Sequence, residues 1–161
     1  MPPDGTNTGL YERDFYAWTI QQAEAIRAAR AARLANTNDL DWDNVAEEIE
    51  SLGRSDRREL ENRIKTVIEH LLKLEHSPAT EPRTGWEDTV DRSRDEIAVV
   101  LAESPSLRVA LPEIVQKASV AAARLAARSM DRHGEQGAAV LRTTPYTADQ
   151  ILDDWWPETA S

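Results

Sequence analysis

The fold of this chain is decided by residues 60–72, which read LENRIKTVIEHLL. Apolar side chains recur in this stretch every three or four positions, which is the spacing of one face of an α-helix. Similar spacing continues on both sides of it, whereas no segment alternates apolar and polar residues as a half-buried strand does. Glycine is scarce, at six residues. The sequence therefore predicts an all-α fold.

Upstream of this stretch, we expect one helix from about Asp14 to Arg33, after a loose leader at residues 1–10. A polar link at residues 36–38 follows, and Asp41 is a good N-cap for a second helix. The side chains expected to face inward on that helix are Trp42, Val45, Ile49 and Leu52. Gly53 is expected to end it, with Ser55 capping the next segment. Because the apolar spacing keeps nearly the same phase across Gly53, a single bent helix is the alternative.

Downstream, turn and capping residues divide the chain into further helices. The expected signals are a stop at Ser77-Pro78, a cap by Thr84 with Glu87, a break at Ser104-Pro105-Ser106, a kink or first turn at Pro112, an end at Gly134, and a cap by Thr147 with Gln150. About five or six helices with short links predict an irregular antiparallel bundle. We expect one domain over residues 11–157, followed by a tail at residues 158–161.

Composition narrows the classes of function. The chain has 161 residues, enough for one proper core, and no cysteine, which excludes disulfides, thiolate metal sites and a cysteine nucleophile. Its net charge of −10 repels phosphate backbones, so nucleic-acid binding is not expected. No apolar run approaches the about 20 residues needed to cross a bilayer, and no signal peptide is apparent. We expect a cytoplasmic protein without a membrane segment.

Three stretches together carry a family resemblance. They are residues 11–18 (YERDFYAW), residues 44–53 (NVAEEIESLG) and residues 70–73 (HLLK), supported by residues 104–107, Pro145-Tyr146 and residues 150–152. In this order the chain resembles the domain-of-unknown-function 29 family, small helical proteins abundant in cyanobacteria and proteobacteria. The resemblance extends from about Tyr11 to Pro157 and implies an all-helical fold. The resemblance implies no catalytic residue. The chain departs from the family pattern at Leu74, where an aromatic residue is expected, and at residues 134–140.

Paired carboxylates are the sharpest candidate for chemistry. Glu47 and Glu50 are three positions apart on one helix face, so they could share a hard cation such as Mg²⁺. Asp88 and Asp91 form a second pair that could face the first. The alternative is a solvated or arginine-paired acidic run at residues 39–50, placed where the helix dipole favours negative charge.

His70 and Lys73 form a second candidate, one helical turn apart beside apolar neighbours. Such a pair could act as acid and base or bind an anion. It could equally pair with Glu47, Glu48 or Glu50 if the two segments pack antiparallel. His76 and His133 are interpreted as favourable charges near helix C-termini.

Surface residues offer two further hypotheses. Arginines form two stripes, Arg27, Arg30 and Arg33 in one and Arg54, Arg57 and Arg58 in the other. They could contact nucleic acid or pair with the acidic run, and the negative net charge favours the pairing. Trp155 and Trp156 cannot both point inward from a short helix, so one is a candidate anchor for a partner or lies over the end of the bundle.

From these observations we expect a helical module without catalytic activity or cofactor, which binds another protein or itself. The alternative is a Mg²⁺-dependent hydrolase of a phosphorylated small molecule, using Glu47, Glu50, Asp88 and Asp91. Nucleic-acid binding through the arginine stripes ranks last. No nucleophile elbow or phosphate loop is present in the sequence.

Overall fold

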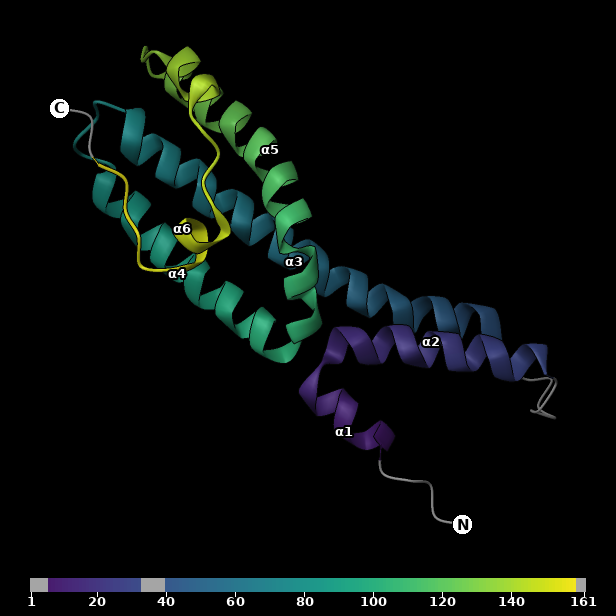
Figure 1. The fold of residues 1–161 in the computed structure, drawn as a ribbon. Helices are drawn as coiled ribbons and strands as arrows, with labels where there is room; N and C mark the ends of the chain where they lie inside the picture. The colour runs from purple at the N-terminus through teal and green to yellow at the C-terminus, as the bar shows by residue number, and fades with distance from the viewer. Residues whose placement is uncertain (1–5, 33–39, 159–161) are drawn as a thin grey trace. The chain divides into compact units, whose positions relative to one another are not determined.

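The computed structural model describes residues 6–32 and 40–158, and all regular secondary structure within them is helical. The α-helices are α1 (Thr6–Arg13), α2 (Phe15–Ala31), α3 (Trp42–His76), α4 (Arg83–Glu103), α5 (Leu111–Arg132) and α6 (Ala148–Leu152) (Figure 1). Two 3₁₀-helices, η1 (Pro105–Ala110) and η2 (Gly137–Arg142), precede and follow α5. The predicted all-α class is confirmed. The polar link at residues 36–38 lies outside the described residues.

Helix α3 runs without interruption through Gly53 and is 35 residues long. The expectation that Gly53 ends a helix is therefore wrong. The glycine serves a different purpose, because it faces Thr19 and Tyr16 of α2, and a Cβ atom there would come within 3.0 Å of the Thr19 hydroxyl. The inward direction predicted for Val45 and Leu52 is also wrong, since both are exposed and Ala46 is buried instead.

Other boundaries agree more closely with the sequence. Asp14 caps α2, as its carboxylate accepts a hydrogen bond from the Ala17 amide at 2.9 Å. Pro112 lies in the first turn of α5, and Gly134, with a positive φ of 75°, follows the end of that helix. Residues 6–10, expected in a leader, belong to α1. Helix α4 begins at Arg83, so Thr84 lies inside it and is not its N-cap.

The contacts divide the chain into two compact units. The first comprises the described residues up to Glu59 together with Val100–Arg108, and the second comprises Leu60–Val99 and the described residues from Val109 onward. The division falls inside α3 and near the end of α4. The prediction of a single domain over residues 11–157 stays a prediction.

In the first unit, α2 lies antiparallel to the beginning of α3. Thr19 faces Gly53, Arg27 contacts Glu50, and Arg30 contacts Asp43, so residue numbers rise along one helix as they fall along the other. Residues 100–108 bind the beginning of α2. Asp14 accepts hydrogen bonds from the amide and the hydroxyl of Ser106 at 2.7 and 2.8 Å. The buried Ser104 hydroxyl oxygen accepts from the Tyr16 amide at 3.1 Å and donates to Asp56 at 3.2 Å.

In the second unit, the remainder of α3 packs with α4 and α5. Arg63 contacts Glu96, and Arg83 donates to the Leu74 carbonyl at 2.7 Å, which makes α3 and α4 antiparallel. The apolar side chains of residues 60–72 that decided the fold are buried, and Leu71 to Leu74 are all buried in succession. Helix α3 is therefore covered on every side at this point, and Leu74 fills the place where the family pattern suggests an aromatic residue.

The chain after α5 folds back over the second unit. Arg94 of α4 is only 8% exposed and holds this segment by its backbone. Its Nε donates to the Ile151 carbonyl at 3.0 Å, and its Nη2 donates to the carbonyls of Gln150 and Trp155 at 3.0 and 2.6 Å. The predicted cap of α6 is confirmed, because Thr147 and Gln150 form a reciprocal capping box.

Candidate functional site

The first carboxylate pair is occupied by arginines. Glu47 contacts Arg54 at 2.5 Å and Arg27 at 3.7 Å, and Glu50 contacts Arg27 at 2.7 Å. The acidic run thus meets the arginine stripes, which was the alternative to a metal site. Of the other residues in that interpretation, Arg33 and Asp39 lie outside the described residues.

The second carboxylate pair belongs to a different unit from the first. Asp88 and Asp91 are exposed on α4 in the second unit, whereas Glu47 and Glu50 belong to the first. Within residues 6–32 and 40–158, no group of three or more acidic or histidine side chains is placed to hold a metal ion. The Mg²⁺ site therefore stays a prediction, and the described side chains do not form a set of ligands for it.

His70 and Lys73 are engaged by their own helix. Lys73 is buried, and its Nζ donates to Glu69 at 2.7 Å, while the His70 Nδ1–H donates to the Thr66 carbonyl at 2.9 Å. The suggested pairing with Glu47, Glu48 or Glu50 is wrong, because it required two antiparallel segments and α3 is one continuous helix.

Trp155 and Trp156 are both half-buried against the second unit. The Trp155 ring packs on Tyr146 with 5.4 Å between ring centroids, and the Arg94 guanidinium lies 4.9 Å from the centroid of Trp156. Of the two alternatives for these residues, this arrangement agrees with packing over the bundle rather than with an exposed anchor.

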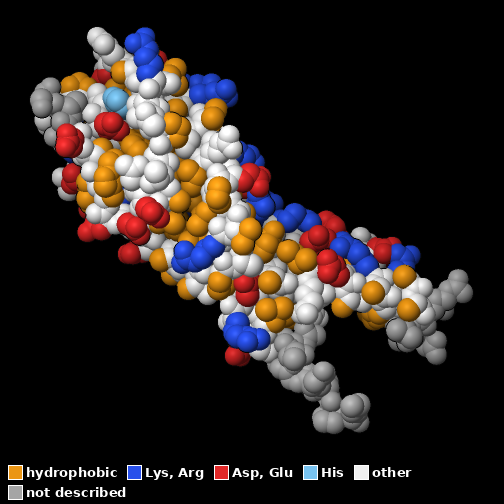
Figure 2. Space-filling model, viewed as in Figure 1, with side chains coloured by type: hydrophobic (Ala, Val, Ile, Leu, Met, Phe, Trp, Pro, Cys, Tyr) orange, Lys and Arg blue, Asp and Glu red, His pale blue; other side chains and the backbone are white. Residues whose placement is uncertain are grey.

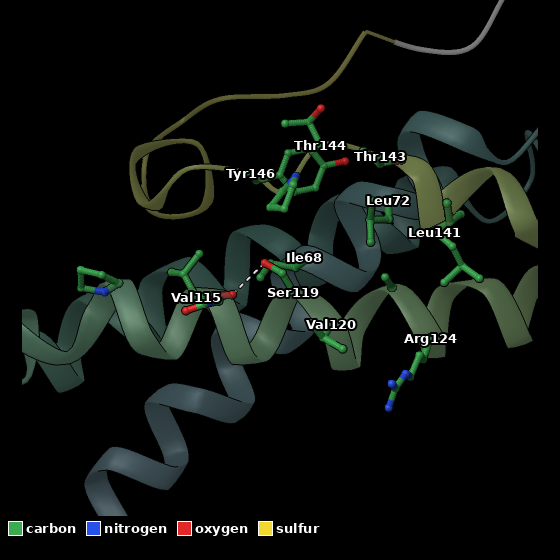
Figure 3. A pocket seen from close by; sticks show the side chains of 15 residues that line it. Ile68, Leu72, Val115, Ser119, Val120, Arg124, Leu141, Thr143, Thr144 and Tyr146 are labelled. Carbon is green, nitrogen blue, oxygen red and sulfur yellow. Dashed lines mark hydrogen bonds between the residues drawn. The ribbon is translucent and has the colours of Figure 1, made fainter.

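An apolar cavity of about 550 Å³ opens beside α5 in the second unit. Figure 3 shows Thr143, Thr144 and Tyr146 on one side of it, residues of α5 on the other, and Ile68 and Leu72 of α3 between. Val120 and Leu141 line it and are themselves 53% and 58% exposed. The Ser119 hydroxyl is already satisfied, since it donates to the Val115 carbonyl at 2.7 Å. In Figure 2, apolar side chains reach the surface over this part of the molecule. Such a lining suits an apolar guest.

A second, more polar cleft of about 510 Å³ adjoins residues 143–146. The Tyr146 hydroxyl donates a hydrogen bond to Glu75, and the Thr143 hydroxyl contacts the His76 Nε2. Burial, and then the neighbouring Glu75 carboxylate, raises the pKa of Tyr146 above its ordinary value. Arg142, Gln150 and Trp155 complete the wall.

Sequence reasoning missed this cleft. His76 was interpreted only as a charge near a helix end, and its partner Thr143 is 67 positions away. One signal was available, because Pro145-Tyr146 and Gln150 belong to the stretches that carry the family resemblance, and both line the cleft.

No helix in the part of the chain that the structure describes is long and apolar enough to cross a membrane. Among curated proteins, none matches this chain. A similar solved structure is the crystal structure of an α-helical protein of unknown function from Rhodospirillum rubrum ATCC 11170. It is 26% identical with a TM-score of 0.70, and the alignment covers 89% of each chain.

The family comparison covers nearly the whole chain. The model of the domain of unknown function DUF29 matches residues 10–156 and therefore includes both units. This agrees with the resemblance seen in the three sequence stretches. The family is described as a domain of unknown function. The chain belongs to the DUF29 family.

Proposed function

We propose that this protein is a non-catalytic interaction module, which binds an acidic, amphipathic helix of another protein along α5. The cavity beside α5 carries the proposal, because it is open, apolar and large enough to receive aliphatic side chains from such a helix. The place of action that fits is the cytoplasm of a bacterium, since the chain has no cysteine and the similar structure comes from a bacterium.

Exposed aliphatic side chains support docking at this cavity. Val120 and Leu141 line it and are exposed. A partner that covered them would remove apolar surface from water, worth about 25 cal/mol per Å² before the cost of association. Apolar anchors from an amphipathic helix recur three and four positions apart, which matches a cavity that follows a helix.

Charge indicates the chemistry of the partner. Between Ile114 and Met130, α5 contains Lys117, Arg124 and Arg128 and no acidic residue, although the whole chain has a net charge of −10. Neither Arg124 nor Arg128 forms an ion pair with a described residue. A helix with acidic residues beside its apolar face would therefore meet complementary charge.

Site-specific photo-crosslinking tests this proposal. A benzophenone amino acid replaces Val120 in cells of a bacterium that carries the protein, and replaces the exposed Val99 of α4 as a matched control. The crosslinked peptide is then identified by mass spectrometry. We expect position 120, and not position 99, to crosslink to an acidic amphipathic segment of another protein. This crosslink should be lost in the variant Arg124→Glu/Arg128→Glu and kept in Arg92→Glu. Crosslinks to a second copy of this chain, or equal labelling at both positions, would contradict the proposal.

A further inference from the structure

We propose that the polar cleft beside Tyr146 binds a small zwitterion of the free α-amino acid class, independently of the helix-binding role of α5. Its walls carry one carboxylate and one guanidinium, together with hydroxyl groups and aromatic rings. A free amino acid presents the matching groups, which are an ammonium, a carboxylate and a side chain.

Glu75 supplies the side of the cleft that would bind the ammonium. One of its carboxylate oxygens accepts the hydrogen bond from Tyr146, and the same oxygen lies 3.9 Å from the His76 Nε2. No lysine or arginine among the described residues pairs with it. A half-buried carboxylate without such a partner attracts a ligand cation more strongly than one in open water.

Arg142 supplies the positive charge in the lining of the cleft. It ends η2, is exposed, and forms no ion pair with a described residue. The hydroxyl groups of Thr143 and Thr144 follow it directly in the chain and line the same cleft. A guanidinium beside hydroxyl donors is the group of choice for a carboxylate, because it can bind both oxygens at once.

The walls are held in place before a ligand arrives. His76 fixes Thr143, the capping box fixes Gln150, and Arg94 fixes the Trp155 backbone. The rings of Tyr146 and Trp155 pack on each other and give the ligand side chain an apolar surface. Preorganised walls reduce the entropy lost on binding.

The paired charges distinguish this ligand class from simpler ions. A phosphate or a plain carboxylate would meet the Glu75 charge, and a plain amine would meet the Arg142 charge. Only a ligand that carries both signs gains from both residues.

The experiment uses the purified full chain. Thermal shift with each of the twenty common amino acids selects the strongest ligand, and calorimetry then compares that amino acid with its amide and its N-acetyl derivative. We expect the parent amino acid to bind at least tenfold more tightly than either derivative. Inorganic phosphate serves as the probe for a plain anion site.

Two substitutions assign the charges. Glu75→Gln, which keeps an acceptor for Tyr146, should weaken the amino acid and its amide but leave the N-acetyl derivative unchanged. Arg142→Gln should weaken the amino acid and its N-acetyl derivative but leave the amide unchanged. Arg128→Gln, on α5 outside the cleft, is the control and should change none. No shift with any amino acid, equal binding of all three forms, or binding of phosphate alone would overturn the proposal.

Discussion

At Gly53 a missing side chain allows two helices to approach each other. Thr19 of α2 is fully buried against this position, and its hydroxyl donates to the Tyr16 carbonyl at 2.7 Å. The glycine lowers the helix propensity of α3 by about 1 kcal/mol relative to alanine. Because it has no Cβ atom, the backbone of α3 can approach Thr19 closely. Gly53, which the sequence predicts to end a helix, is thus a packing site within one.

We predict that Gly53→Ala destabilises the protein by about 1–3 kcal/mol, because the new Cβ would overlap the Thr19 hydroxyl. Urea unfolding measures the change. Gly85→Ala is the matched control, since a Cβ at this helical position meets no atom within 4 Å and should stabilise by about 0.5–1 kcal/mol. The double variant Thr19→Ala/Gly53→Ala should recover part of the loss. A stable Gly53→Ala protein would contradict the role given to this glycine.

We predict that Tyr146 makes the free energy of unfolding fall at alkaline pH. Its pKa is raised above the ordinary value of 10.0, so above that pH the unfolded chain releases the phenol proton while the folded chain keeps it. The folded state then binds more protons, and the free energy of unfolding falls as pH rises, by up to about 1.4 kcal/mol per pH unit.

The test compares urea unfolding of the parent chain and Tyr146→Phe between pH 9 and 11. Tyr146→Phe should be less stable at pH 7 by about 1 kcal/mol, because it loses the bond to Glu75, yet its stability should fall less steeply above pH 10. Tyr11→Phe, which removes an exposed hydroxyl, should keep the parent slope. Equal slopes in all three proteins would rule out this effect of Tyr146.

Some residues that act on near neighbours could be predicted from the sequence, although the cap assigned to Thr84 was wrong. Residues that act across the fold could not be predicted. Asp14 caps the amide three positions on, and Thr147 does the same for Gln150, so a short window contains both partners. Tyr146 and Glu75 are 71 positions apart, and no pattern within either segment indicates the other. The polar cleft was missed for this reason.

At the scale of elements, the segment after α5 depends on one buried arginine. Arg94 makes its three hydrogen bonds to backbone carbonyls of residues 150–155, and burial lowers its pKa despite nearby Asp91, Asp154 and Asp153. The capping box in the sequence predicts α6. The arginine that binds this segment lies on α4, and its local sequence does not distinguish it from the other arginines of that helix.

We predict that Arg94→Met destabilises the protein by about 2–4 kcal/mol, because three carbonyl groups lose a charged donor. It should also expose the chain after residue 144 to protease at concentrations that leave the parent intact. Arg92→Met, the exposed neighbour on α4, should change stability by less than about 0.5 kcal/mol. Unchanged proteolysis of the C-terminal segment in Arg94→Met would contradict the anchoring role of Arg94.

At the scale of the whole molecule, the two parts of α3 differ in what holds them in place. Along α2 and the part of α3 up to Glu59, the buried apolar side chains are the small Ala23 and Ala46, and the ion pairs are exposed. Leu60, Ile64, Val67 and Ile68 begin a much larger core in the second unit. Exposed ion pairs contribute little, so α3 gains more stability from packing after Leu60 than before it.

Hydrogen exchange should therefore change along a single helix. We predict that amides at residues 43–57 of α3 exchange faster than those at residues 62–75, and that 1 M salt accelerates only the first group, because it screens the ion pairs with α2. Exchange followed by mass spectrometry of overlapping peptides measures both. Uniform protection along α3 would indicate one cooperative unit instead.

The position of residues 100–108 in the chain limits how recombination can transfer this fold between genes. They belong to the first unit although they lie between the two stretches that form the second, so neither unit is a continuous piece of the chain. A gene fragment that stops at residue 59 would encode Asp14 and Tyr16 without the serines that bind them. Recombination that moved one unit into another gene would deliver it incomplete. A single continuous fragment of the gene therefore encodes neither unit completely.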